Sequence, residues 1–90
     1  MKKSPVEAYS WVVRGKQRRD IINHIGDRET PTQISQKSGY SLNHTSRVLN
    51  EFKRKGIARI LNPKQKTGRI YELTGKGKII RDEIRKKAQK

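Results

Sequence analysis

Apolar residues recur at helical spacing in several short segments of the chain, and polar turn residues separate these segments. Near the middle, Thr30, Pro31 and Gln33 form a capping-box pattern, with a hydroxyl before the helix and proline at its first position. The predicted helix begins near Pro31, directs Ile34 inward and ends by Gly39, which tolerates the positive φ of a tight turn. The pattern therefore predicts a short helix that closes in a turn.

A second helix is predicted to begin after Ser41, its N-cap, and to end at Gly56. Its apolar stripe has the three- and four-residue spacing of a buried helix face and contains Leu42, Thr45, Val48, Leu49 and Phe52. The opposite face carries side chains that suit base edges or phosphates in a major groove, namely Asn43, His44, Arg47 and Asn50. Two helices joined by a tight turn predict a helix-turn-helix.

Extended segments follow the second helix. Residues 57–62 and 69–74 are rich in Ile, Leu and Tyr, and a stretch with proline, lysine and glycine separates them. This order predicts a β-hairpin that projects as a wing beside the helix-turn-helix. The wing is cationic through Lys64 and Lys66 at its tip and Arg69 at its base.

Two more helices are predicted before the helix-turn-helix. A capping box at Ser4 to Glu7 predicts a helix over residues 5–13. Its buried face is expected to contain Val6, Tyr9 and Val13. A helix over residues 16–25 is expected to be the first of a three-helix core, with Gly26 as its end. The side chains that this helix directs inward are Ile21, Ile22 and Ile25. Residues 27–29 then form a polar connection.

Thr74 is predicted to cap a last helix that begins at about Gly75. The apolar side of this helix contains Ile79, Ile80, Ile84 and Ala88. The fold class is therefore mainly α with a small β-hairpin (α+β), a winged helix-turn-helix with a three-helix core, a wing and flanking N- and C-terminal helices. Residues 1–90 form a single domain, with the helix-turn-helix at about 31–55, the wing at about 57–74 and the C-terminal helix at about 75–88.

The net charge favours a polyanionic partner. The 90 residues include 23 Lys and Arg against 8 Asp and Glu, which gives a formal net charge of +15 and a pI of about 10.7. Such a pI is typical of nucleic-acid-binding domains. Residues 1–56 hold 12 basic and 5 acidic side chains (+7) and residues 57–90 hold 11 and 3 (+8). Because both parts are basic, the whole domain is expected to attract nucleic acid.

Other classes of protein lack their sequence signals. The absence of cysteine excludes a disulfide framework, a Cys-based zinc finger and a thiol nucleophile. His24 and His44 have no surrounding ligand set and no catalytic constellation is present, so we expect no enzyme, no metal and no other cofactor. The longest N-terminal apolar cluster is Trp11-Val12-Val13, so no membrane span or signal peptide is expected. The expected location is the cytoplasm, in association with the nucleoid.

Three stretches, taken in order, resemble the recognition helix, wing and post-wing segment of MarR- and ArsR-like winged-helix transcription regulators. They are residues 41–49 (SLNHTSRVL), residues 52–57 with Phe52 and Lys55-Gly56-Ile57, and residues 68–77 (GRIYELTGKG). The chain is most similar to small, archaeal-type members, over residues 16–85. The resemblance implies that Ser46 and Arg47 lie on the recognition helix and that the arginine contacts DNA. Long dimerisation helices and cysteines, found in ligand- and metal-sensing members, are missing, so no small-molecule effector is expected.

Three groups of residues are expected to contact double-stranded DNA. The recognition helix provides Ser41, Asn43, His44, Ser46, Arg47 and Asn50, with Arg47 the first choice for a base contact. Phosphate contacts are expected from Thr32, Gln33, Arg14, Lys16 and Arg18, the first two through free amides at a helix N-terminus. The wing provides Lys64, Lys66 and Arg69 for the backbone or the minor groove. The plainer interpretation, that all of these are solvated surface residues, stays open.

The leading functional interpretation is a sequence-specific transcription regulator that binds double-stranded DNA. Two alternatives remain open, a non-specific architectural chromatin protein and an RNA-binding or protein-interaction winged helix.

A homodimer is also expected, because an apolar fraction of 30% leaves a small core. Its predicted interface combines Val6, Tyr9 and Trp11 with Ile79, Ile80 and Ile84. In the monomeric alternative, both terminal segments fold back over Ile21, Ile22 and Ile25.

Overall fold

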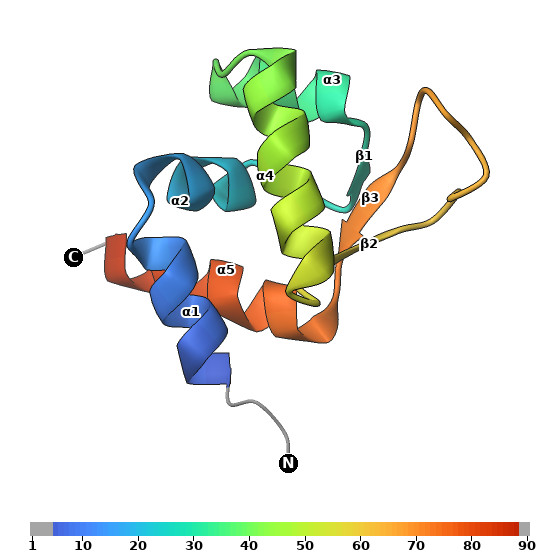
Figure 1. Cartoon of the computed structure of the whole chain (residues 1–90). Helices are drawn as coiled ribbons and strands as arrows, with labels where there is room; N and C mark the ends of the chain where they lie inside the picture. Colours follow the sequence, from blue (N-terminus) through green and yellow to red (C-terminus); the bar gives the residue numbers. More distant parts are fainter. Residues whose placement is uncertain (1–4, 89–90) are drawn as a thin grey trace.

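The computed structural model describes residues 5–88, which form five helices and one three-stranded antiparallel sheet. The helices are α1 (Pro5–Val13), α2 (Lys16–Asn23), α3 (Pro31–Ser38), α4 (Leu42–Arg54) and α5 (Gly75–Ala88). The strands are β1 (Arg28–Glu29), β2 (Ala58–Ile60) and β3 (Tyr71–Leu73), in the sheet order β1-β3-β2. In Figure 1, α4 runs through the middle of the molecule, α5 lies below it, and the loop between β2 and β3 projects to one side. The predicted winged helix-turn-helix is confirmed.

The helix-turn-helix is held by the local signals that predict it. Thr30 Oγ1 accepts a hydrogen bond from the Gln33 amide at 3.2 Å, and Gln33 Oε1 accepts one from the Thr30 amide at 3.0 Å. Gly39 ends α3 with a φ of 84°, a conformation that favours glycine. Ser41 Oγ then accepts from the His44 amide at 3.1 Å and begins α4. The predicted caps and turn are therefore confirmed, whereas Ser4 lies outside the described residues.

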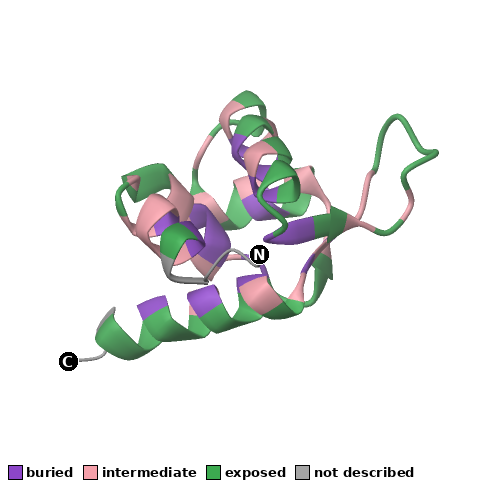
Figure 2. Cartoon of the chain, turned by 60° about the horizontal axis from the view of Figure 1, so that its bottom comes forward, coloured by how far each residue is buried: buried purple, intermediate pink, exposed green. Residues whose placement is uncertain are grey.

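The core gathers side chains from every helix and from the sheet. Its largest fully buried members are Phe52, Ile21, Ile22, Ile25, Ile34, Leu49, Ile57, Leu73, Ile80, Val12 and Thr45. In Figure 2, buried segments (purple) occur on the helices and the sheet, whereas most of the wing loop is exposed (green). Helix α4 contributes the inward row that its spacing predicts, from Thr45 to Phe52. Leu42 does not belong to this row, because its side chain lies on the surface.

The inward face of the first helix includes more residues than predicted. The predicted Tyr9 and Val13 are partly buried and pack against the core, whereas the buried positions are Ala8 and Val12. Helix α1 packs against both α2 and α5. The predicted positions Tyr9 and Val13 are therefore confirmed in part. The side chain of Val6 lies outside the described residues.

The last helix covers the protein's own core. Ile80 and Ile84 of α5 are 1% and 7% exposed, and α5 packs on α1 and α2. The terminal segments thus fold back over the isoleucines of α2, as the monomeric alternative requires. Ile79, which the sequence places beside the line of Ile80 and Ile84, is 56% exposed. The side chain of Ala88 is not among those described.

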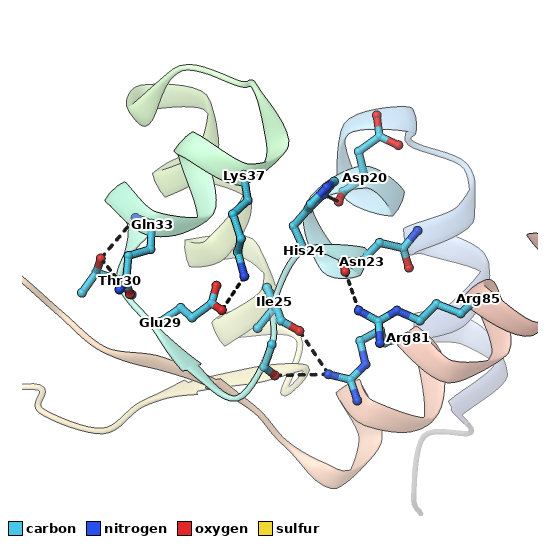
Figure 3. Close-up of polar contacts among 11 residues, drawn as sticks. Asp20, Asn23, His24, Ile25, Glu29, Thr30, Gln33, Lys37, Arg81 and Arg85 are labelled. Atoms are coloured by element: carbon cyan, nitrogen blue, oxygen red, sulfur yellow. Dashed lines mark hydrogen bonds and ion pairs between the residues drawn. The ribbon is translucent and has the colours of Figure 1, made fainter.

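Two arginines of α5 determine where α2 ends. Arg81 donates to the carbonyls of Ile25 and Gly26 at 3.1 and 3.2 Å, and Arg85 donates to the carbonyl of Asn23 at 2.6 Å (Figure 3). Guanidinium groups stabilise the free carbonyls and the negative end of a helix. The predicted end at Gly26 is therefore wrong, since α2 ends at Asn23 and Ile25 is buried beyond it.

The connection after α2 is a short strand. Arg28 and Glu29 of β1 pair with Glu72 and Tyr71 of β3, so the predicted polar connection contains a strand that the sequence does not predict. On one face of the sheet, Glu72 lies across from Arg28 and from Arg59. Its carboxylate accepts from Arg59 at 2.7 Å and from Arg28 at 3.4 Å. One acidic side chain therefore links all three strands.

Thr74 joins the sheet to α5. Its amide donates to the Ile57 carbonyl at 2.9 Å, and its hydroxyl donates to the Gly56 carbonyl at 2.6 Å. The hydroxyl also accepts from the Gly77 amide at 3.2 Å, which confirms the predicted cap. Helix α5 approaches the strand so closely that a Cβ on Gly77 would lie 2.1 Å from the Ile57 carbonyl oxygen. Glycine is therefore required at position 77 by close packing.

Candidate nucleic-acid interface

Helix α4 presents an exposed polar surface between the start of α2 and the wing. Asn43, Arg47 and Asn50 are exposed on it, as the sequence predicts. The Ser41 hydroxyl caps the helix, because it accepts a hydrogen bond from the His44 amide. His44 itself is half-buried, with its ring centroid 6.3 Å from that of Tyr40. The exposed polar surface of α4 thus centres on the two asparagines and Arg47.

A first hollow of about 410 Å³ lies where α4 meets the start of α2. Its charged and polar lining consists of Lys16, Gln17, Arg18, His44, Arg47 and Glu51. The fold therefore brings the predicted phosphate-binding cations of α2 beside the predicted reading residues of α4, although 26 or more positions separate them in the sequence. Arg14 is exposed and lines neither this hollow nor the second one described below.

The two α2 cations of this first hollow also have structural partners. Arg18 donates to the Trp11 carbonyl at 2.7 Å, and its guanidinium carbon lies 4.2 Å from the centre of the Trp11 ring. Lys16 forms an ion pair with Asp20 at 2.9 Å. The hydrogen bond to Asp20 raises the pKa of Lys16, and the same bond, with a second from the Tyr40 hydroxyl at 2.7 Å, lowers the pKa of Asp20. Lys16 therefore stays charged at neutral pH.

A second hollow of about 380 Å³ separates α4 from the wing. It brings together Thr32, Ser46, Asn50, Lys66 and Arg69, all predicted to contact DNA. Leu42, Thr67 and Tyr71 also line it. Lys64, at the wing tip, is exposed but does not reach this hollow. Cations from the wing thus face the polar edge of α4 across an open gap.

The wing loop has an internal frame below its tip. Asn62 Oδ1 accepts from the Ile70 amide at 2.7 Å, and Asn62 Nδ2 donates to the Gly68 carbonyl at 3.2 Å. Gly68 has a φ of 67°, in the left-handed region. Arg69 donates to the Gln65 carbonyl at 2.8 Å, so part of its guanidinium is used within the loop. Lys64 and Lys66 remain exposed and form no ion pair with any residue that the structure describes.

The start of α3 offers less to a phosphate than the sequence predicts. The amide of Gln33 donates to Thr30 Oγ1, and its side chain accepts from Thr30 (Figure 3). Gln33 is therefore part of the capping box, and the prediction that its amide is free is wrong. Thr32 is exposed beside the second hollow.

Charge is distributed unevenly between this surface and the remainder of the chain. Between positions 30 and 70, Glu51 is the sole acidic residue. The same stretch contains the basic residues Lys37, Arg47, Lys53, Arg54, Lys55, Arg59, Lys64, Lys66 and Arg69. Elsewhere, Asp20, Glu29, Glu72 and Asp82 form ion pairs, and the hydrogen bond from Arg59 lowers the pKa of Glu72. The helix-turn-helix and wing therefore form the most one-sidedly basic part of the protein.

Sequence reasoning missed two residues at this surface. Leu42 was assigned to the buried stripe by its spacing, but it lies at the edge of the second hollow with 47% of its side chain exposed. Glu51 lines the first hollow beside Arg47. The sequence does contain a signal for Glu51, because it is the one acidic residue among nine basic residues between positions 30 and 70. No comparable signal distinguishes Leu42 from a core leucine.

Other kinds of site have little support in the part of the chain that the structure describes. No group of three or more metal-binding side chains occurs within residues 5–88. The Nδ1 atom of His24 is 2.7 Å from the Asp20 carbonyl oxygen (Figure 3). Among the described helices, none combines the length and apolarity that a membrane crossing requires.

Solved structures share this fold. A MarR family transcription regulator superposes with a TM-score of 0.75 and 22% identity, over 93% of this chain and 60% of the regulator. A second MarR family regulator, from Silicibacter pomeroyi DSS-3, superposes with a TM-score of 0.74 and 10% identity, over 93% of this chain and 63% of that regulator. TubR bound to 24 bp of tubC, from Bacillus thuringiensis serovar israelensis pBtoxis, superposes with a TM-score of 0.76 and 14% identity, over 97% of this chain and 98% of TubR.

The chain thus spans about 60% of the MarR regulators and nearly all of TubR. At these identities the likeness establishes the fold, and it agrees with the resemblance noted in the sequence. Searches against protein-family models and against curated protein sequences give no significant match.

Proposed function

We propose that this protein is a sequence-specific double-stranded DNA-binding transcription regulator. Helix α4 enters the major groove and reads bases through Asn43, Arg47 and Asn50. The wing follows the backbone into the adjacent minor groove with Lys64 and Lys66. Ser41, His44 and Ser46 lie in the N-terminal part of the same helix and make secondary contacts with the DNA. No catalytic step and no small-molecule effector are part of the proposal.

One observation carries this proposal. The exposed polar face of α4 is bordered on both sides by hollows that hold cations from other elements, α2 on one side and the wing on the other. A single helix that reads bases while flanking cations neutralise phosphates is the division of roles found in DNA recognition. The net charge of +15 and the fold shared with MarR regulators and with DNA-bound TubR support it further.

The test is competition binding with duplex DNA, single-stranded DNA and structured RNA. About 5 to 8 phosphate contacts per protomer predict that log K falls with log salt at a slope of roughly −4 to −7 on duplex DNA. Selection from random and genomic duplexes then measures specificity. A slope near zero for every duplex, or stronger binding to RNA, contradicts the proposal. Uniform binding to all duplexes supports an architectural chromatin role instead.

A second candidate is a DNA-binding role in plasmid segregation. It is favoured by one observation, the nearly end-to-end match with TubR, which is described as a plasmid segregation protein. Both candidates predict duplex binding, so the position of the selected fragments distinguishes them. Fragments upstream of genes support regulation, whereas a cluster on a plasmid supports segregation.

We also propose that the protein acts as a homodimer in the cytoplasm, on the nucleoid. Two protomers place two recognition helices about 34 Å apart on a pseudo-palindromic site. The interface cannot use Ile80 and Ile84, which are buried within one protomer, so Ile79 and the partly buried Tyr9 and Trp11 are the apolar groups available. Sedimentation equilibrium at micromolar concentration tests the dimer, and a mass of 10.5 kDa with one-to-one binding to a half-site excludes it.

A further inference from the structure

Leu42 is an exposed leucine on the proposed DNA-binding surface. Its side chain is 47% exposed, and it belongs neither to the buried core nor to the partly buried residues that pack against the core. It lies at the start of α4, one and two turns before Ser46 and Asn50 on the same side of the helix. Because the fold does not bury this side chain, its apolar surface is available to a ligand.

The neighbours of Leu42 indicate what kind of ligand fits. Leu42 lines the second hollow together with Asn50, Lys66 and Arg69. The two cations suit phosphate, and the amide of Asn50 suits a base edge, whereas Leu42 offers only methyl groups. The ligand must therefore combine negative charge, hydrogen-bonding edges and an exposed apolar group. Duplex DNA has this combination in its major groove, where the 5-methyl group of thymine is exposed.

The position of Leu42 along α4 also fits a base contact. The first residues of a recognition helix reach deepest into the major groove. Leu42 is the first residue of α4, directly after the Ser41 cap. A helix that enters the groove by this end brings Leu42 to the base edges before Arg47, which is more than one turn later.

We propose that Leu42 is a specificity-determining residue that recognises the 5-methyl group of a thymine. The inference rests on the proposed function, since it requires α4 in the major groove of duplex DNA. The side chain discriminates thymine from cytosine at one position, because cytosine has no methyl group there. Arg47 and Asn50 supply hydrogen bonds at other positions, so the two kinds of contact are separable.

The test replaces thymines one at a time with deoxyuridine, which removes only the methyl group. The best duplex from random selection is used with the wild-type protein and with Leu42→Ala. At one thymine position we expect deoxyuridine to weaken wild-type binding about three- to fivefold, the scale of one buried methyl group. Leu42→Ala should bind thymine and deoxyuridine duplexes equally well at that position. Fluorescence anisotropy at fixed salt measures both.

One control variant matches the size of the change. Leu61→Ala removes another large exposed hydrophobic side chain of the described residues, and it should keep the wild-type loss with deoxyuridine. Thermal unfolding of Leu42→Ala establishes that the variant is folded.

The outcomes separate the two proposals. Equal deoxyuridine sensitivity in wild type and Leu42→Ala overturns the role of Leu42 and leaves DNA binding intact. The same holds if selection yields a preferred sequence but no thymine position in it responds. If selection yields no preferred sequence, both the role of Leu42 and the sequence-specific function fail, although binding to duplex DNA remains. If the wild-type protein binds no duplex at all, the proposed function itself fails.

Discussion

Gly77→Ala should destabilise the fold, because α5 touches the backbone of the chain at this residue. A Cβ at position 77 would lie 2.1 Å from the Ile57 carbonyl oxygen, whereas real Cβ atoms are almost never closer than 3.0 Å to a heavy atom. The start of α5 must therefore move by about 0.9 Å, the difference between these two distances. The Ile57 carbonyl cannot yield easily, since it also accepts the Thr74 amide at 2.9 Å.

The expected loss follows from three contributions. Overpacking of this kind costs about 1–3 kcal/mol. Distortion of a hydrogen bond to the Ile57 carbonyl costs about 1 kcal/mol. Replacing glycine by alanine within a helix returns about 1 kcal/mol. The net loss is therefore about 1–3 kcal/mol, which lowers the Tm of a domain of this size by roughly 4–24 °C.

Gly75→Ala is the matched control, because no atom lies within 4 Å of a Cβ built on Gly75. This variant should be as stable as the wild type or more stable by up to about 1 kcal/mol. Urea unfolding, followed by circular dichroism and by the fluorescence of Trp11, the single tryptophan, measures both variants. If Gly77→Ala is as stable as Gly75→Ala, the proposed contact with Ile57 does not exist.

Three further predictions concern the interface, the core and the sheet. Arg47→Ala should cost about 1–3 kcal/mol on a selected site and relax its sequence preference, whereas Lys64→Ala should weaken all duplexes alike and reduce the salt slope by about one. Equal losses for Arg47→Ala on specific and random DNA exclude it as a reading residue. Thr45→Val should stabilise the protein by about 1 kcal/mol in urea, because the buried Thr45 hydroxyl has no hydrogen-bond partner in the structure; a loss of stability contradicts this. Arg59 lowers the pKa of Glu72 below 4.5, so the charged carboxylate stabilises the fold at neutral pH, and this stabilisation is lost as the pH falls through 4.5 and below. Glu72→Gln should therefore be less stable than wild type at neutral pH, and the difference should shrink as the pH falls below 4.5; a difference in urea midpoint that does not change with pH refutes this role.

The sequence predicts the parts of the fold that depend on neighbouring residues. The Thr30 cap, the Gly39 turn and the Ser41 cap are recognisable because each signal and its effect lie within four residues. The wing is predictable for a related reason, since its two strands follow one another in the chain with only a loop between them. The same holds for the start of α5 at Thr74.

The features that the sequence does not predict depend on distant partners. Strand β1 is two polar residues long, and it is a strand only because Glu72, 44 positions from Arg28, lies beside it. Helix α2 ends early because Arg81 and Arg85 reach its carbonyls from α5. Neither contact leaves a pattern in the local sequence.

The candidate site likewise has features that the local sequence predicts and features that depend on distant residues. The polar face of α4 was predictable from helical spacing, and the cations of the wing from the hairpin pattern. The exposure of Leu42 was not, because an apolar residue at a core-like spacing looks the same whether or not a neighbour covers it. Which cations share a hollow with Arg47 also depends on how α2 crosses α4.

The pairing of β1 with β3 encloses the entire helix-turn-helix within one closed loop of the chain. Closing a loop of this length is entropically unfavourable, and only two residue pairs of β1 repay the cost. Helices α3 and α4, in contrast, are adjacent in the chain and pack closely on each other. During folding, we therefore expect the helix pair to form first and β1 to join the sheet late. By the same logic, the amides of β1 should exchange with solvent faster than those of α4, through local opening that leaves the recognition helix in place.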